Sequence, residues 1–240
     1  MKKIWFITLF PNLIKEVLSH GVIGNFFNDR DDSQIQLEFL NPSDFSPKGY
    51  KGVDSSPYGG SPGMVIRADV LSCCLEEGIL KNYNNLQDVH IIYPTPRGKR
   101  WNNQHAKQLL NKTETKDIVF VCGRYEGVDE RFLTKYVNEE ISIGDYVLSG
   151  GELAAAIIVD SSLRFKDRVL GNNQSAHNDS FENNLLDSPK YTRPRIFAGI
   201  PVPDILLSGD HQKIAEFDLQ QRYEQTLLHR PDLLKNLEKN

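Results

Sequence analysis

The stretch that decides the fold of this chain is Asp117-Ile118-Val119-Phe120-Val121-Cys122-Gly123. It is a short apolar run, rich in β-branched side chains, that a glycine ends at once. Such a run is typical of a strand that is buried on both faces, with helices covering the sheet on either side. We therefore expect this stretch to lie inside a sheet.

Shorter apolar runs on both sides of this stretch alternate with segments of helical periodicity. Further strands are predicted over residues 4–9, 34–40, 89–93 and 140–148, and helices over residues 11–18, 67–79, 102–110, 128–136 and 152–162. Strands alternating with helices predict an α/β domain with a mainly parallel sheet. The strand beginning at Val89 is expected to stop at Pro94, and residues 41–63, rich in Pro and Gly, are expected to form a loop.

The composition changes after residue 170. A polar segment rich in Asn, Ser and Asp comes first, then several prolines, then a helical pattern from about Asp210 to Leu227 and a further turn at 233–237. These changes predict a first domain of residues 1–170, a flexible linker of residues 171–185 and a small helical domain of residues 186–240.

The composition of the whole chain argues against several classes of protein. Its 240 residues are 39% hydrophobic, too apolar for a disordered chain. No run approaches the roughly 18 apolar residues of a membrane span, so no membrane association is expected. Three cysteines, an odd number, argue against a disulfide framework and favour a cytoplasmic location. The net charge of −4 argues against coating of nucleic acid by bulk charge, but it leaves room for a local basic surface.

Three predicted strands end in loops rich in Gly or Pro, namely Tyr93–Arg100, Val121–Gly127 and Ser142–Glu152. Ligands of open α/β sheets bind beyond the carboxyl ends of the strands, and glycines let the backbone approach a flat polar ligand such as adenine. Any one of these loops alone is explained by a tight turn, whereas three at consecutive strand ends favour a ligand site. The sequence has no dinucleotide-binding or P-loop glycine motif, no Gly-x-Ser-x-Gly elbow and no His pair at zinc spacing, so no metal site is predicted.

A carboxylate, Asp179, stands in the polar segment directly before Ser180 and Phe181. Short polar residues at this point are typical of a helix N-cap, and the pattern alone favours that interpretation. The alternative is a general base on a mobile segment that becomes ordered over a substrate.

Basic residues gather in two places, each with an aromatic residue among them. They are Arg97, Lys99, Arg100 and Lys107 in the first and Lys190, Arg193 and Arg195 in the second. Basic and aromatic side chains together suit RNA, whose phosphates attract the charge and whose exposed bases stack. Taken alone, each patch is also explained as a solvated surface.

Four blocks of the sequence resemble the bacterial tRNA (guanine-N1)-methyltransferase family. They are Ser56–Met64; Cys122–Gly127 with Asp129-Glu130-Arg131; Ser142–Leu153; and Asp179–Phe181 with Leu185-Leu186-Asp187 and Tyr191–Pro194. The resemblance extends from the first predicted strand to Arg230–Leu234, and the second and third blocks are long and specific. One departure is that His177 and Asn178 precede Asp179 where the family more usually has Thr-Glu.

This resemblance implies a fold, a cofactor and an assembly. The implied fold carries a deep trefoil knot at the C-terminal end of the α/β domain, an exception to the rule against threaded chains. S-adenosylmethionine is expected to bind on the three strand-end loops, and the protein is expected to be a homodimer with its active site across the interface. The implied cofactor residues are Pro96, Gly98, Gly123, Tyr125, Glu126, Ile143, Tyr146, Leu148, Gly150 and Gly151.

The implied reaction is methylation of N1 of guanosine 37 in the tRNA anticodon stem-loop, where a G precedes that base. By match to the family, Asp179 is the general base that removes the N1 proton, which reverses the preference for a helix cap. Arg164 is the arginine that stabilises charge on guanine O6. The basic residues above are expected to contact the tRNA. The family is also linked to magnesium, but no oxygen cluster in the sequence places an ion.

Two other functions fit the same resemblance less well. An RNA-binding protein on this scaffold, without catalysis, is disfavoured because Asp179, Arg164 and the glycine loops are all present. A methyltransferase of rRNA or of a ribose oxygen is disfavoured by the Asp-Ser-Phe segment, because ribose methylation needs no base matched to a nucleobase N–H.

Overall fold

The computed structural model describes residues 2–28, 35–46, 52–112, 116–166, 169 and 179–235. The chain divides into two compact units, Met1–Gly171 and Asn172–Asn240, and each is described by itself. No helix among the described residues is long and apolar enough to cross a membrane.

The first unit is built on one five-stranded sheet in which every neighbouring pair is parallel. Its strand order is β2 (Ile35–Leu40), β1 (Lys2–Ile7), β6 (Asp117–Val121), β5 (Val89–Arg100) and β7 (Glu139–Ser142). The stretch that begins at Asp117 is the central strand, with Ile118–Val121 all fully buried. The expected parallel α/β architecture is confirmed.

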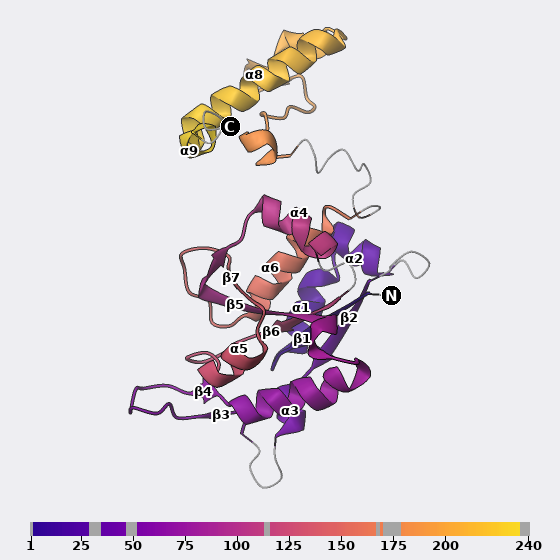
Figure 1. The fold of residues 1–240 in the computed structure, drawn as a ribbon. Helices are drawn as coiled ribbons and strands as arrows, with labels where there is room; N and C mark the ends of the chain where they lie inside the picture. The colour runs from indigo at the N-terminus through magenta and orange to yellow at the C-terminus, as the bar shows by residue number, and fades with distance from the viewer. Residues whose placement is uncertain are drawn as a thin grey trace. The chain divides into compact units, whose positions relative to one another are not determined.

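Helices cover both faces of this sheet, as Figure 1 shows. One face packs against α1 (Pro11–Leu18), α2 (Gly21–Asn28), α4 (Asn103–Lys112) and α6 (Glu152–Leu163), and the other against α3 (Ala68–Gly78) and α5 (Glu130–Tyr136). Because side chains alternate along a strand, Ile4 and Phe6 belong to the first core and Trp5 and Ile7 to the second.

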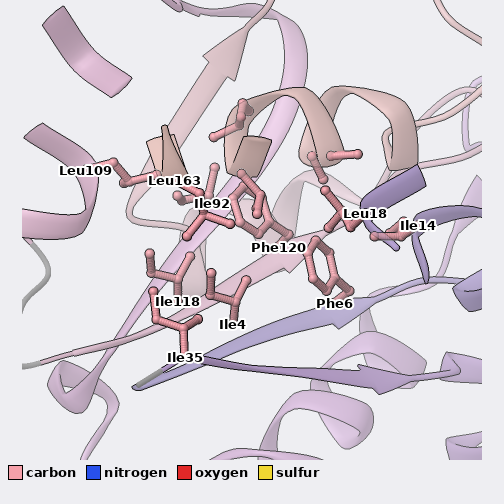
Figure 2. Packing of buried hydrophobic residues seen from close by; sticks show 14 of the residues in the cluster. Ile4, Phe6, Ile14, Leu18, Ile35, Ile92, Leu109, Ile118, Phe120 and Leu163 are labelled. Atoms are coloured by element: carbon pink, nitrogen blue, oxygen red, sulfur yellow. The ribbon is translucent and has the colours of Figure 1, made fainter. Parts of the chain in front are cut away.

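Aromatic stacking fixes the centre of the first core, shown in Figure 2. The ring of Phe6 on β1 lies 5.4 Å from that of Phe120 on β6 and 5.2 Å from that of Phe39 on β2. Leu163 at the end of α6 is fully buried in the same cluster. This packing holds α6 against the strands whose carboxyl ends carry the predicted ligand loops.

The structure corrects the predicted end of the strand that begins at Val89. Strand β5 continues to Arg100: Pro94 pairs with Ile141 of β7, the register then shifts, and Lys99 faces Ile141 again. Residues 95–98 form a bulge between these two pairings. The chain can rejoin β7 because Gly98 has no side chain: a Cβ there would lie 2.4 Å from the backbone N of Ile141.

Other element boundaries also differ from the sequence prediction. The predicted strand 140–148 ends at Ser142, and α5 begins at Glu130 rather than residue 128, because the Asp129 carboxylate accepts a hydrogen bond from the Arg131 backbone N–H at 2.9 Å and caps the helix. The predicted loop 41–63 contains β3 (Asp54–Ser55), which pairs antiparallel with β4 (Val65–Ile66). Helix α2 was not predicted.

The second unit contains a long helix, α8 (His211–His229), followed by α9 (Pro231–Leu234). It also has two 3₁₀ turns, η4 (Glu182–Asn184) and η5 (Asp204–Leu207), and an antiparallel pair of β8 (Ile196–Phe197) and β9 (Ile200–Pro201). The Thr226 hydroxyl of α8 accepts a hydrogen bond from the Leu186 backbone N–H at 2.8 Å. The predicted helix from Asp210 is confirmed, whereas most of the predicted linker, residues 171–178, lies outside the described residues.

Candidate active site

A cavity of about 300 Å³ lies at the carboxyl ends of β5, β6 and β7. Its walls are residues 93–96 of β5 at its bulge, residues 123–127 after β6, residues between 141 and 151 at the end of β7 and beyond it, and Ala154 of α6. The three loops come from separate parts of the chain. They meet because strands in a parallel sheet end at one edge, which is where such sheets bind ligands.

Nine of the ten residues predicted to bind a cofactor line this one cavity. They are Pro96, Gly123, Tyr125, Glu126, Ile143, Tyr146, Leu148, Gly150 and Gly151. The tenth, Gly98, lies in the β5 bulge, packed against the backbone of β7, and does not line the cavity. The cavity also includes Tyr93 and Arg124, which lie in two of the predicted strand-end loops but were not among the predicted cofactor residues, and Ala154 of α6.

Glycines allow the second and third loops to touch. The Gly151 N–H donates to the Gly123 carbonyl at 2.9 Å, and a Cβ on Gly151 would lie 3.1 Å from the Cα of Cys122. A Cβ on Gly123 would lie 2.8 Å from the Tyr93 hydroxyl oxygen. The backbone of both loops therefore approaches the cavity with no side chain in between, as a flat polar ligand requires.

Aromatic side chains stand at this cavity with much of their surface exposed. Tyr125 and Tyr146 are 57% and 54% exposed. Tyr125 also has a φ of 58°, in the left-handed region that bulky residues avoid at a cost of about 1–2 kcal/mol. The turn is held by a hydrogen bond from the Gly127 N–H to the Arg124 carbonyl at 2.9 Å. Strain of this kind gathers at functional sites, which fits a ligand-contacting role for Tyr125.

A buried carboxylate, Glu152 at the start of α6, lies beside the cavity. It is 1% exposed, and its Oε2 lies 3.0 Å from Nε of Arg124. Its Oε1 accepts a hydrogen bond from the Thr8 hydroxyl at 2.8 Å. Burial and the nearby Glu152 charge raise the pKa of the Cys122 thiol well above its usual value, which disfavours the reactive thiolate form.

The predicted RNA-binding cations differ in how they are paired. Arg97 in the β5 bulge donates to both carboxylate oxygens of Glu140, at 2.6 and 2.9 Å, and also contacts Glu130. These hydrogen bonds raise the pKa of Arg97 and fasten the bulge to β7 and α5. In the second unit, Lys190 lies 2.8 Å from Asp187 and Arg195 lies 3.3 Å from Asp204.

The two predicted catalytic residues belong to different units. Arg164 is the exposed C-cap of α6 in the first unit, and Asp179 is a half-buried residue of the second. The Asp179 carboxylate accepts a hydrogen bond from the Ser180 N–H at 2.9 Å. No α-helix starts there: only the short turn η4 follows, and its N-cap is Phe181. The helix-cap interpretation is therefore wrong, while the catalytic pairing stays a prediction; His177 lies outside the described residues.

An open parallel sheet with a glycine-walled cavity at its carboxyl edge defines a class of α/β proteins that bind a nucleotide-like small molecule there. Within the described ranges, no group of three or more His, Cys, Asp or Glu residues is placed to hold a metal ion.

Comparison with known proteins specifies the family. A family model described as tRNA (Guanine-1)-methyltransferase TrmD matches residues 1–236. A tRNA (guanine-N(1)-)-methyltransferase of Buchnera aphidicola subsp. Schizaphis graminum is 46% identical over 236 residues, covering 97% of this chain and 86% of that protein. A tRNA (guanine-N(1)-)-methyltransferase of Hahella chejuensis is 42% identical over 245 residues, covering 99% of this chain and 90% of that protein. The chain belongs to the tRNA (guanine-1)-methyltransferase family and is a methyltransferase, which confirms the resemblance.

Proposed function

We propose that this protein transfers a methyl group from S-adenosylmethionine to N1 of guanosine 37 in tRNAs that carry a G before that base. The observation that carries the proposal is the single cavity at the sheet edge, which gathers nine of the ten residues expected to hold the cofactor. Membership of the family supports the reaction type, and the names of the relatives support guanine N1 of tRNA as the acceptor.

The cavity suits S-adenosylmethionine in its size and chemistry. Apolar Ile143 and Leu148 offer flat contact to an adenine ring, the glycine backbones offer hydrogen-bonding groups, and the Glu126 carboxylate offers a partner for an ammonium group. When bound, S-adenosylmethionine supplies an electrophilic methyl group on its sulfonium. The contribution of this chain is to hold that group in place and to prepare the guanine for attack.

Guanine N1 carries a proton in its neutral form and is a poor nucleophile. In the proposed reaction, Asp179 accepts this proton as the bond from N1 to the methyl carbon forms. The bond from the sulfonium sulfur to that carbon breaks at the same time, and S-adenosylhomocysteine leaves as the neutral thioether. Negative charge develops on guanine O6 as the proton leaves, and the guanidinium of Arg164 stabilises it. Both assignments rest on the match to the family. The exposure of Arg164 and the half-exposed carboxylate of Asp179 support them, because neither side chain is enclosed in a core.

The basic residues are proposed to contact the anticodon stem-loop. Lys99, Arg100 and Arg193 are the strongest candidates because they make no ion pair with any described residue. Arg97, Lys190 and Arg195 first have to exchange a carboxylate for a phosphate, which lowers the net gain from each contact. The local basic surface is thus smaller than the sequence suggested.

We also propose that the protein is a homodimer and that α1 and α6 form part of the interface. These two helices pack together, and each exposes a pair of apolar residues one turn apart: Leu13 and Val17 on α1, Leu153 and Ile157 on α6. All four are between 38% and 46% exposed. Apolar side chains exposed on two packed helices are typical of an interaction surface, and a second copy of the chain fits it because the resemblance to the family implies a dimer.

Replacing Ile157 with aspartate is expected to convert the dimer to a monomer, because a charge then enters an apolar interface without a partner. Light scattering behind gel filtration measures the mass of each species. Leu86→Asp, a change at an apolar residue in the turn η3 (Leu86–Asp88) before β5, is the matched control and is expected to stay dimeric. A monomeric wild-type protein, or an Ile157→Asp variant that remains dimeric, contradicts the proposal.

The knot implied by the family is part of the same proposal. It is supported by the contact between the loop after β6 and the loop before α6, where the Gly151 N–H donates a hydrogen bond to the Gly123 carbonyl.

The choice of tRNA tests the proposed substrate. Changing the base before position 37 from G to A is expected to lower turnover at least about 100-fold, because a site built to hydrogen-bond one base edge rejects another. Single-turnover methylation of transcribed tRNAs measures the effect, with a base-pair change in the acceptor stem as the control. Equal rates on both anticodon-loop sequences rule out the proposed selectivity.

A further inference from the structure

We propose that Glu152 is a positioning residue for the cofactor, and that it acts through Arg124. This inference rests on the proposed function of the cavity as the S-adenosylmethionine site. Arg124 lines the cavity, whereas Glu152 is buried behind it and does not. Neither residue is among those that the sequence predicts to bind the cofactor or to take part in catalysis.

Glu152 is a buried carboxylate, and its charge needs partners inside the protein. A carboxylate that is 1% exposed is costly unless it is fully paired. Two groups face it: the Thr8 hydroxyl at the end of β1, which donates to Oε1 at 2.8 Å, and the guanidinium of Arg124, whose Nε lies 3.0 Å from Oε2. The second contact is an ion pair without hydrogen-bond geometry, so Nε of Arg124 and Oε2 of Glu152 each lack a hydrogen-bond partner among the residues that the structure describes.

Arg124 in turn connects three segments at the sheet edge. Its Nη1 donates to the Ser149 carbonyl in the loop before α6 at 3.1 Å, and its guanidinium lies 4.3 Å from the ring of Phe10. The Thr8 hydroxyl also accepts a hydrogen bond from the Phe10 backbone N–H at 2.9 Å. The end of β1, the loop after β6 and the loop after β7 therefore meet at one ion pair.

The wall of the cavity lies directly on this pair. A Cβ on Gly150 would lie 2.3 Å from Nε of Arg124 and 2.5 Å from Oε2 of Glu152. The backbone of Gly150 also forms a bridge with Arg124. Since Gly150 lines the cavity, any shift of the pair moves a surface that the cofactor contacts. Glu152 thus fixes the wall by holding the arginine.

A purely structural role is the alternative. Glu152 lies in the first turn of α6, where a negative charge is favourable for the helix dipole whatever it pairs with. In that case its loss lowers stability but leaves the cofactor affinity of the folded protein unchanged. Affinity and stability therefore have to be measured separately.

The experiment uses the full chain carrying Glu152→Gln, Arg124→Met or both. Ser162→Ala is the matched control, because Ser162 is equally buried on the same helix but bonds only to Ile158 of that helix among the described residues. Titration calorimetry gives the Kd for S-adenosylmethionine, steady-state assays with tRNA give kcat and KM, and thermal unfolding gives Tm.

The expected result is a Kd raised about 10-fold or more by Glu152→Gln, with kcat at saturating cofactor within about threefold of wild type. In the Arg124→Met background, Glu152→Gln is expected to alter the Kd less than twofold, because the effects of substitutions at residues that act as a unit do not add. Ser162→Ala is expected to leave the Kd unchanged.

Two results overturn this inference while leaving the proposed function intact. One is tight binding by wild type with a Kd unchanged by Glu152→Gln. The other is a change in Kd on Glu152→Gln that is equally large in the wild-type and the Arg124→Met backgrounds. Failure of the wild-type protein to bind S-adenosylmethionine overturns the proposed cofactor site itself, and with it the role of Glu152.

Discussion

Replacing Asp179 with asparagine is expected to lower the rate of guanine methylation at least about 100-fold while S-adenosylmethionine binding is retained. An amide has nearly the same shape as a carboxylate but cannot accept the N1 proton, and loss of a general base typically costs 10²–10⁴ in rate. The carboxylate belongs to the second unit, whereas the cavity belongs to the first. The change therefore leaves the cavity walls as they are.

Single-turnover rates with saturating tRNA and cofactor measure the chemical step, and calorimetry measures cofactor affinity. Asp232→Asn is the matched control, since this exposed aspartate of the same unit pairs with Arg230. We expect the control to react at the wild-type rate. A methylation rate of Asp179→Asn within about threefold of the wild-type rate refutes the assignment. A loss of rate that is fully explained by weaker cofactor binding refutes it as well.

Replacing Gly98 with alanine is expected to weaken S-adenosylmethionine binding at least about 10-fold and to destabilise the first unit by about 1–3 kcal/mol. The new Cβ would lie 2.4–2.6 Å from backbone atoms of Glu140 and Ile141, which cannot turn aside as a flexible side chain can. The bulge therefore has to lift away from β7. Pro96, which lines the cavity, is part of the same bulge and moves with it.

Calorimetry and thermal unfolding measure the two effects. Gly21→Ala is the control, because a Cβ there meets nothing within 4 Å and the only cost is its φ of 64°, worth about 1–2 kcal/mol. Both variants are expected to lose stability, but only Gly98→Ala is expected to lose affinity. An unchanged Kd in Gly98→Ala contradicts the view that the bulge positions the cavity wall.

The sequence predicted correctly those features for which a single physical rule relates a local residue pattern to a position in the fold. The apolar run at Asp117–Cys122 predicted a buried strand, and the structure makes it the central strand of the sheet. Strand order did not matter for predicting the ligand site, because parallel strands end at a common edge. That rule is why residues as far apart as Pro96 and Gly151 line one cavity.

The features that the sequence did not predict depend on contacts between distant parts of the chain. Helix α2 contains two glycines, which disfavour a helix, yet Ile23 and Phe26 pack into the first core and override that preference. The continuation of β5 past Pro94 depends on Ile141, which no local pattern reveals.

The same holds for charges near the site. Arg97 belonged to a basic run in the sequence, but Glu140 of β7 neutralises it in the fold. The ion pair of Arg124 and Glu152 likewise joins the loop after β6 to the start of α6, which are separate in the sequence. The local sequence around Arg124 and Glu152 shows only a charged residue beside glycines, and ordinary solvent-exposed turns show the same pattern.

The identity and position of the methylated nucleoside test the proposed reaction directly. Purified protein is incubated with S-adenosylmethionine and unmodified tRNA carrying G before position 37, and the digested product is analysed by mass spectrometry. The expected product is 1-methylguanosine at position 37 and nowhere else. A methyl group on another position, on another atom of guanosine or on a ribose would contradict the proposed reaction.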